Sequence, residues 1–151
     1  MAGKPEREQA KVPVKVAIDA LAAKGLKEIS QQADFRSLSQ LCEAMLFFAK
    51  DTLKSDGTDS LIFYLKDIKA GMLSALPDVR TLPPQSSLHL TLDCDAAKTL
   101  DHLVNTYPAV FSNRNDAIGL LGQLVLERCA DADGELYITR RLKDALASRD
   151  Y

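Results

Sequence analysis

Two short segments of the chain alternate strictly between apolar and polar positions. Residues 12–18 place valine or isoleucine at every second position, and residues 88–92 place leucine there. A period of two is typical of a β-strand with one buried and one exposed face. We therefore predict two half-buried strands. The opposite face then carries Pro13, Lys15, Ala17, His89 and Thr91.

Each predicted strand is followed by two segments whose apolar residues recur every three or four positions, the spacing of an amphipathic helix. The first helix is predicted over residues 20–33 and over residues 95–106, directly after an aspartate that ends the strand. A capping box marks the start of each second helix. The boxes pair Ser37 with Gln40 and Asn113 with Asp116.

A third apolar segment follows each pair of helices. Residues 61–76 predict a helix, although Ile62-Phe63-Tyr64 favours a strand locally. Residues 136–147 form a shorter equivalent, and the proline-containing segment 81–86 predicts an extended linker into the second strand.

The chain repeats itself with an offset of 74 residues. Residues 14–19 match residues 88–93, and residues 22–26 match residues 96–100. After two extra residues in the second copy, the capping boxes also align. The sequence therefore predicts one strand-helix-helix unit that has been duplicated.

A single short strand leaves its backbone unpaired, and two short helices cannot cover its apolar face. Two units solve both problems by pairing their strands antiparallel above four helices. The predicted fold class is therefore mainly α with a short two-stranded antiparallel ribbon, an internally duplicated pseudodimer in one chain. Along the chain we expect a flexible arm over residues 1–11, a single domain over residues 12–131 and a C-terminal helical extension over residues 132–151. The domain has two halves, 12–54 and 87–131, joined by a connector with an extra helix, 55–86.

Composition and charge exclude several classes of protein. The 151 residues are 46% hydrophobic and 26% charged, which excludes a wholly disordered chain, collagen and a coiled coil. No apolar run approaches the length of a membrane span, and residues 1–11 lack the apolar core of a secretory signal. The three cysteines are odd in number and lie in no paired-spacing motif, which fits a reduced, cytoplasmic setting. The net charge of −2 argues against nucleic-acid binding by the whole surface but allows a local basic face.

Motifs for chemistry are missing from the sequence. It has no glycine-rich phosphate loop, no HExxH zinc motif and no nucleophile elbow. Cys94 and Cys129 have no nearby histidine or second cysteine with metal-ligand spacing, and Cys42 falls on an apolar position of the repeat. We expect a protein that is not an enzyme and that needs no cofactor or metal.

The duplicated pattern resembles the ribbon-helix-helix (MetJ/Arc-type) family of DNA-binding proteins. The resemblance rests on the alternating strand, the first helix and a capped turn, which reads Arg36-Ser37-Leu38-Ser39-Gln40 in one half and Ser112-Asn113-Arg114-Asn115-Asp116 in the other. It covers residues 12–54 and 87–130. The single-chain tandem form is similar to accessory proteins of DNA transfer, namely the TraY-type relaxosome proteins of conjugation and, closer in layout, the C2-type virulence proteins of T-DNA transfer.

The resemblance implies binding of double-stranded DNA in the bacterial cytoplasm, with the ribbon in the major groove and the helix starts on the phosphates. The residues implied for base contacts are Lys15, Ala17, His89 and Thr91. Those implied for phosphate contacts are Arg36, Ser37, Ser39, Asn113, Arg114 and Asn115. The arm with Lys4, Arg7 and Lys11 is expected to follow the DNA backbone. Because the two halves carry different outward side chains, we expect an asymmetric target.

Three functions stay open at this point. The first is a sequence-selective accessory factor that marks or bends a site for a relaxase or another DNA-processing protein. The second is a transcriptional repressor, and the third is a protein-interaction module, such as an antitoxin or scaffold, that does not bind DNA. The acidic pI of about 5.7 favours the third. The helical extension with Arg140, Arg141 and Lys143 would distinguish it, since an accessible apolar surface there indicates a partner.

Overall fold

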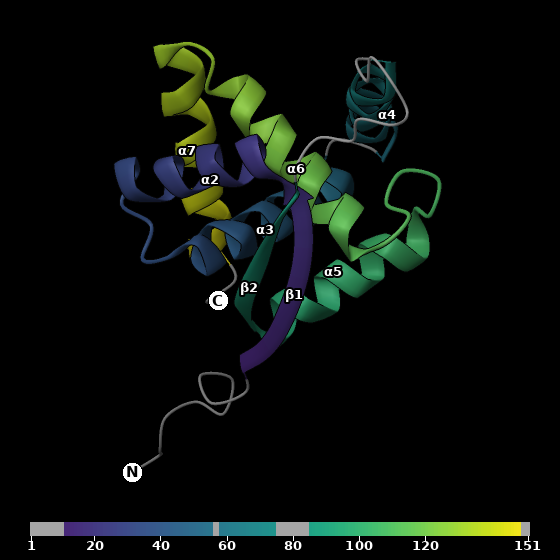
Figure 1. Ribbon diagram of the computed structural model, residues 1–151, viewed down its shortest axis with the longest axis horizontal. Helices are drawn as coiled ribbons and strands as arrows, with labels where there is room; N and C mark the ends of the chain where they lie inside the picture. Colours follow the sequence, from purple (N-terminus) through teal and green to yellow (C-terminus); the bar gives the residue numbers. More distant parts are fainter. Residues whose placement is uncertain (1–10, 56–57, 75–84, 149–151) are drawn as a thin grey trace.

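The computed structural model describes residues 11–55, 58–74 and 85–148, and within them the chain is mainly helical with one two-stranded antiparallel sheet (Figure 1). This confirms the predicted class of secondary structure. Most of the predicted arm and of the predicted linker lies outside the described residues. The elements are β1 (Lys11–Asp19), α2 (Ala20–Gln32), α3 (Leu38–Ser55), α4 (Thr58–Ser74), β2 (Gln85–Asp93), α5 (Cys94–Thr106), α6 (Arg114–Arg128) and α7 (Ala132–Ser148).

The two strands pair along their whole length, with Lys15 directly opposite His89. Both are longer than predicted. The difference is largest at the start of β2, where the polar residues Gln85–Ser87 pair with Ala17–Asp19. No alternation of apolar residues marks that stretch, because backbone hydrogen bonding rather than side-chain burial makes it a strand.

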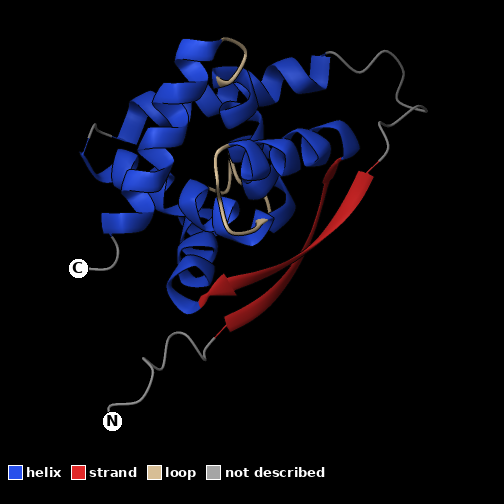
Figure 2. Ribbon diagram, turned by 90° about the vertical axis from the view of Figure 1, so that its left-hand side faces the viewer, coloured by secondary structure: helices blue, strands red, loops and turns tan. Residues whose placement is uncertain are grey.

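The helices cover only one face of the ribbon (Figure 2). Six inward positions of the strands are buried: Val14, Val16, Ile18, Leu88, Leu90 and Leu92. The helices supply most of the rest of the apolar core. Figure 2 shows the opposite face of the ribbon at the edge of the molecule, away from the helices. The largest fully buried side chains are Leu26, Leu41, Met45, Leu46, Leu65, Leu90, Leu92, Leu100, Leu103, Phe111, Ile118 and Leu121.

An aspartate joins each strand to its first helix, as the sequence predicts. The Asp19 carboxylate accepts hydrogen bonds from the N–H groups of Leu21 and Ala22, at 3.1 and 3.2 Å. The Asp93 carboxylate accepts one from the N–H of Asp95 at 2.9 Å. These bonds satisfy N–H groups that the first turn of a helix leaves without a partner, so each helix begins directly at the strand end.

Both predicted capping boxes form. The N–H of Gln40 donates to Ser37 Oγ at 3.1 Å, and the N–H of Asp116 donates to Asn113 Oδ1 at 2.9 Å. The Gln40 and Asp116 side chains in turn accept from the N–H of the residue just before each cap, at 2.7 and 3.3 Å. Two donors are therefore satisfied at each start, and the two helix starts share one hydrogen-bond pattern.

The third segments are helices, as predicted, and each packs on both α3 and α6. Helix α7 lies mainly on α3, and α4 lies on both α3 and α6. Arg128 of α6 stacks on the Tyr64 ring of α4, with 4.9 Å from guanidinium carbon to ring centroid. None of the helices among the described residues is long and apolar enough to cross a membrane.

Candidate nucleic-acid interface

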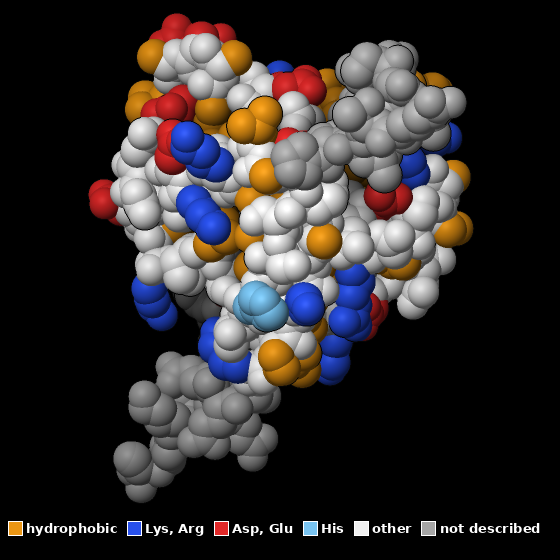
Figure 3. Space-filling view, viewed as in Figure 1, with side chains coloured by type: hydrophobic (Ala, Val, Ile, Leu, Met, Phe, Trp, Pro, Cys, Tyr) orange, Lys and Arg blue, Asp and Glu red, His pale blue; other side chains and the backbone are white. Residues whose placement is uncertain are grey.

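The outer face of the ribbon carries all four side chains that the sequence assigned to base contacts. In Figure 3 a histidine and several Lys and Arg side chains gather over this face, whereas Asp and Glu side chains lie mainly toward the top and the edges. Between the strand ends, the outward positions hold no acidic residue. They are Lys11, Pro13, Lys15, Ala17, Gln85, Ser87, His89 and Thr91, of which only Ala17 is partly buried.

These outward side chains match the chemistry of base edges in a major groove. Lys15 can donate to guanine O6 and N7, and the hydroxyl and imidazole groups can donate or accept. The Ala17 methyl can contact the methyl group of thymine. Sequence reasoning missed Ser87, which lies opposite Ala17, because the strand was predicted to begin one residue later.

The start of each second helix is hydrogen-bonded to the ribbon. Ser39 Oγ of α3 accepts from the N–H of Thr91 in β2 at 2.9 Å. Asn115 Oδ1 of α6 accepts from the N–H of Ala17 in β1, also at 2.9 Å. Each strand is thus held by the helix that follows the other strand. The two helix starts therefore flank the ribbon at fixed positions, one on each side.

The side chains predicted to contact phosphates already have roles within the fold. Ser37 and Asn113 accept the capping hydrogen bonds described above, and Ser39 and Asn115 hold the strands. Their carboxamide and hydroxyl groups position the ribbon and the helix starts. This use inside the protein could not be deduced from the sequence, because the bonds to the ribbon join residues more than fifty positions apart.

The two predicted phosphate-contacting arginines lie in different environments. Arg114 forms a two-pronged ion pair with Asp101 of α5, with 3.0 Å from Nε and 3.1 Å from Nη2 to the carboxylate oxygens. Arg36 is exposed, and its guanidinium makes no hydrogen bond or ion pair within the part of the chain that the structure describes. Of the two arginines, Arg36 alone has no pair among the described residues that a ligand would have to break.

A lysine that sequence reasoning missed lies at the start of α6. Lys69 of α4 donates to the carbonyl oxygen of Val110 and to Ser112 Oγ, both at 3.1 Å, and lies 3.4 Å from the Asp116 carboxylate. No local signal in the sequence could have found it, because these bonds join residues more than forty positions apart.

The remaining candidates for chemistry in the described part of the chain are its metal-ligand side chains and its cysteines. It contains no group of three or more His, Cys, Asp or Glu side chains that could hold a metal ion. Burial raises the pKa of the Cys42 thiol to about 12. Burial, with the nearby Glu135 carboxylate, also raises the pKa of Cys129. Both thiols therefore stay protonated near neutral pH, and neither is an activated nucleophile.

Comparisons with known proteins leave this surface to be interpreted from its own geometry. No family model, curated protein or solved structure matches the chain. The resemblance to ribbon-helix-helix proteins therefore rests on the strands, the capped turns and their spacing in this chain.

Proposed function

We propose that this protein binds double-stranded DNA as a tandem, single-chain ribbon-helix-helix protein, with the β1–β2 ribbon inserted in the major groove. The observation that carries the proposal is the outer face of the ribbon, which is exposed, free of acidic side chains between the strand ends, and flanked by two helix starts. A major groove admits a two-stranded ribbon. The helix layer behind the ribbon leaves this face open to such a partner (Figure 2).

The proposal includes the duplication of one unit. In the ribbon, Lys15 lies opposite His89, its counterpart in the repeat. The strand-end aspartates, the capping boxes and the helix-to-strand hydrogen bonds each occur twice in the same relation. These observations support an approximate twofold axis through the centre of the ribbon. Because Lys15 faces a histidine rather than a second lysine, the two halves of the DNA target should differ in sequence.

For the cellular role we propose a sequence-selective accessory protein of conjugative plasmid or T-DNA processing, acting in the bacterial cytoplasm beside a relaxase or a similar enzyme. This part rests on the likeness of the tandem layout to such proteins. A repressor would use the same ribbon face, so the choice depends on where the preferred DNA sequence lies in the genome.

One observation favours a second candidate, a protein-interaction module. Two neighbouring apolar side chains of α7 are exposed, Leu136 at 66% and Tyr137 at 57%, and so is Phe63 of α4 at 69%. Exposed apolar side chains of this size are common at interfaces between proteins. In that case the ribbon would be structural and would show no affinity for DNA.

A DNA titration distinguishes the two. We expect the protein to bind a labelled random-sequence duplex, and Lys15→Ala and His89→Ala to weaken binding about tenfold each. Lys66→Ala removes an exposed lysine from α4, which lies away from the ribbon (Figure 1), and should leave the affinity unchanged. A folded protein that does not bind duplex DNA even at low salt would overturn the proposal and favour the second candidate.

A further inference from the structure

A groove of about 730 Å³ runs along the α3 side of the ribbon. Its walls come from the ribbon, from the turn before α3 and from the last turns of α7, and Thr91 of the ribbon is among its lining residues. Three cationic side chains from three different elements line it: Lys11, Arg36 and Lys143. The groove therefore joins the outer face of the ribbon to a cluster of positive charge.

Lys143 is held in this groove by an aromatic ring. Its Nζ lies 5.5 Å from the centroid of the Phe35 ring, which is buried in the turn before α3. A cation over an aromatic face at this distance is attracted to the ring and keeps its N–H groups available. Arg36 follows Phe35 in the chain, so the ring that holds Lys143 of α7 belongs to the same turn as Arg36.

Two carboxylates also line the groove, and they differ in availability. Glu43 is 4% exposed, accepts a hydrogen bond from the N–H of Asp93 at 2.5 Å and lies 3.8 Å from Lys11 Nζ. Asp34 is exposed at the rim. Since Glu43 is paired with Lys11, the charge of Arg36 and Lys143 exceeds that of Asp34, and the groove favours an anion.

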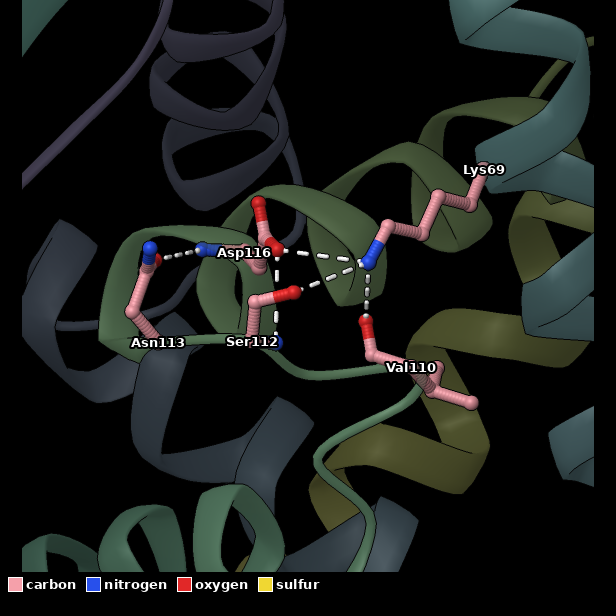
Figure 4. Close-up of polar contacts among 5 residues, drawn as sticks. All are labelled: Lys69, Val110, Ser112, Asn113 and Asp116. Carbon is pink, nitrogen blue, oxygen red and sulfur yellow. Dashed lines mark hydrogen bonds and ion pairs between the residues drawn. The ribbon is translucent and has the colours of Figure 1, made fainter.

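The corresponding cations on the α6 side are already neutralised. Lys69 lies beside the turn before α6, as Lys143 lies beside the turn before α3, but it donates to Ser112 and Val110 and pairs with Asp116 (Figure 4). Arg114 is paired with Asp101. Among the described residues, Arg36 and Lys143 on the α3 side are therefore less neutralised than Lys69 and Arg114 on the α6 side.

We propose that the groove on the α3 side is a binding site for the DNA phosphate backbone, in which Arg36 and Lys143 contact phosphodiester groups, and that the α6 side contributes much less. This inference rests on the proposed function. The protein then holds the two flanks of its DNA site unequally. Helix α7, which lies outside both strand-helix-helix units, is thereby part of the DNA-binding surface.

The test is the salt dependence of binding to a fluorescently labelled random-sequence duplex, measured by anisotropy. Affinity falls as salt rises, and removing one cation that neutralises a phosphate reduces the absolute slope of log affinity against log salt by roughly 0.9. We expect Arg36→Ala and Lys143→Ala each to weaken binding about fivefold and to reduce the absolute slope by about that amount. Arg114→Ala, the matched variant on the α6 side, should change the slope by much less, and Lys66→Ala should change neither quantity.

A variant that is expected to strengthen DNA binding distinguishes a specific effect from loss of the fold. Asp34→Asn removes the carboxylate at the rim and keeps a residue that tolerates the same backbone conformation. It should strengthen DNA binding about twofold, which unfolding cannot do.

The results separate this inference from the proposed function. If the unaltered protein does not bind the duplex, both fail. If it binds, and Lys15→Ala weakens it while Arg36→Ala and Lys143→Ala keep the original slope, the groove inference is wrong and DNA binding by the ribbon stands. If Arg114→Ala reduces the absolute slope as much as Arg36→Ala does, the inequality of the two sides is wrong.

Discussion

Asp34 adopts a left-handed backbone conformation, with φ of 60°, where α2 turns into α3. The N–H of Phe35 donates to the Ser30 carbonyl at 2.9 Å, and the N–H of Asp34 donates to the Gln31 carbonyl at 3.4 Å, a pattern that usually has glycine at the left-handed position. We predict that Asp34→Gly raises the free energy of unfolding by about 0.5 kcal/mol, because relief of strain exceeds the entropy that glycine loses. Urea unfolding measures the change. Gln32→Gly, in the last turn of α2, should instead lower stability by about 0.5–1 kcal/mol. A lower free energy of unfolding in both variants would contradict the claim that the backbone at Asp34 is strained.

Cys42 lies within the core, where burial raises the pKa of its thiol from 9.0 to about 12. Unfolded chains therefore lose this proton at lower pH than folded ones. The contribution to stability is complete below pH 9.0 and is lost as the pH rises toward 12. We predict that the free energy of unfolding falls above pH 9 more steeply than in Cys42→Ala, by up to about 1.4 kcal/mol per pH unit.

The same burial protects the Cys42 thiol from reagents. Alkylation at neutral pH should modify the partly exposed Cys94 in the native protein and Cys42 only after denaturation, as mass spectrometry of the peptides would show. Modification of native Cys42 at the rate of Cys94 would show that the core opens without global unfolding.

At the scale of elements, the hydrogen bonds from the helix starts to the strands hold the ribbon in place. Ser39→Ala and Asn115→Ala each leave a strand N–H, that of Thr91 or Ala17, without its protein partner. We predict a loss of about 1 kcal/mol in the free energy of unfolding for each, from urea unfolding. Asn105→Ala, at an exposed position of α5, should cost nothing. Unchanged stability in the first two variants would mean that water replaces these bonds at no cost.

Close packing of α2 on α6 depends on glycine. A Cβ on Gly122 would lie 2.8 Å from a methyl carbon of Leu26, which is fully buried and has little room to move. We predict that Gly122→Ala lowers the free energy of unfolding by about 1–2 kcal/mol through overpacking. Gly71→Ala in α4, where a Cβ would meet nothing within 4 Å, should raise it by about 0.5–1 kcal/mol through helix propensity. Changes of the same sign in thermal unfolding would contradict this account.

The elements were predictable from the sequence where local rules decide them. Alternation identified both strands, and side-chain caps located the helix starts at Ser37 and Asn113, because both signals lie within a few residues of the structure that they specify. The polar beginning of β2 carried no such signal. The antiparallel pairing itself followed from a wider argument, that two half-buried strands in one chain need each other.

The contacts that decide which candidate residues are free were not predictable in this way. The pairing of Arg114 with Asp101 and the position of Lys143 over the Phe35 ring depend on how separate helices pack. Sequence reasoning treated Arg36 and Arg114 as equivalent because the two capped turns look alike. The structure distinguishes them through neighbours that come from other elements.

At the scale of the whole molecule, the charge distribution limits how DNA can approach. The chain has a net charge of −2, so the molecule as a whole weakly repels a polyanion at long range. The ribbon face and the groove beside it form a local exception. Affinity should therefore depend on a small number of cations, which explains why single substitutions such as Lys143→Ala are expected to have measurable effects.

The ribbon is also complete within one chain, since each strand has its partner in the same molecule and the apolar face is covered by the chain's own helices. Proteins that build such a ribbon from two chains lose stability on dilution, because folding and association are linked. We predict that the thermal unfolding midpoint of this protein does not change with protein concentration, and that its sedimentation is that of a monomer. Any rise of the midpoint with concentration would show that the folded state gains stability from a second copy. The apolar side chains Leu136 and Tyr137 would then be the first positions to test. If they form the interface, Leu136→Ser and Tyr137→Ser remove it, and the midpoint becomes independent of concentration again.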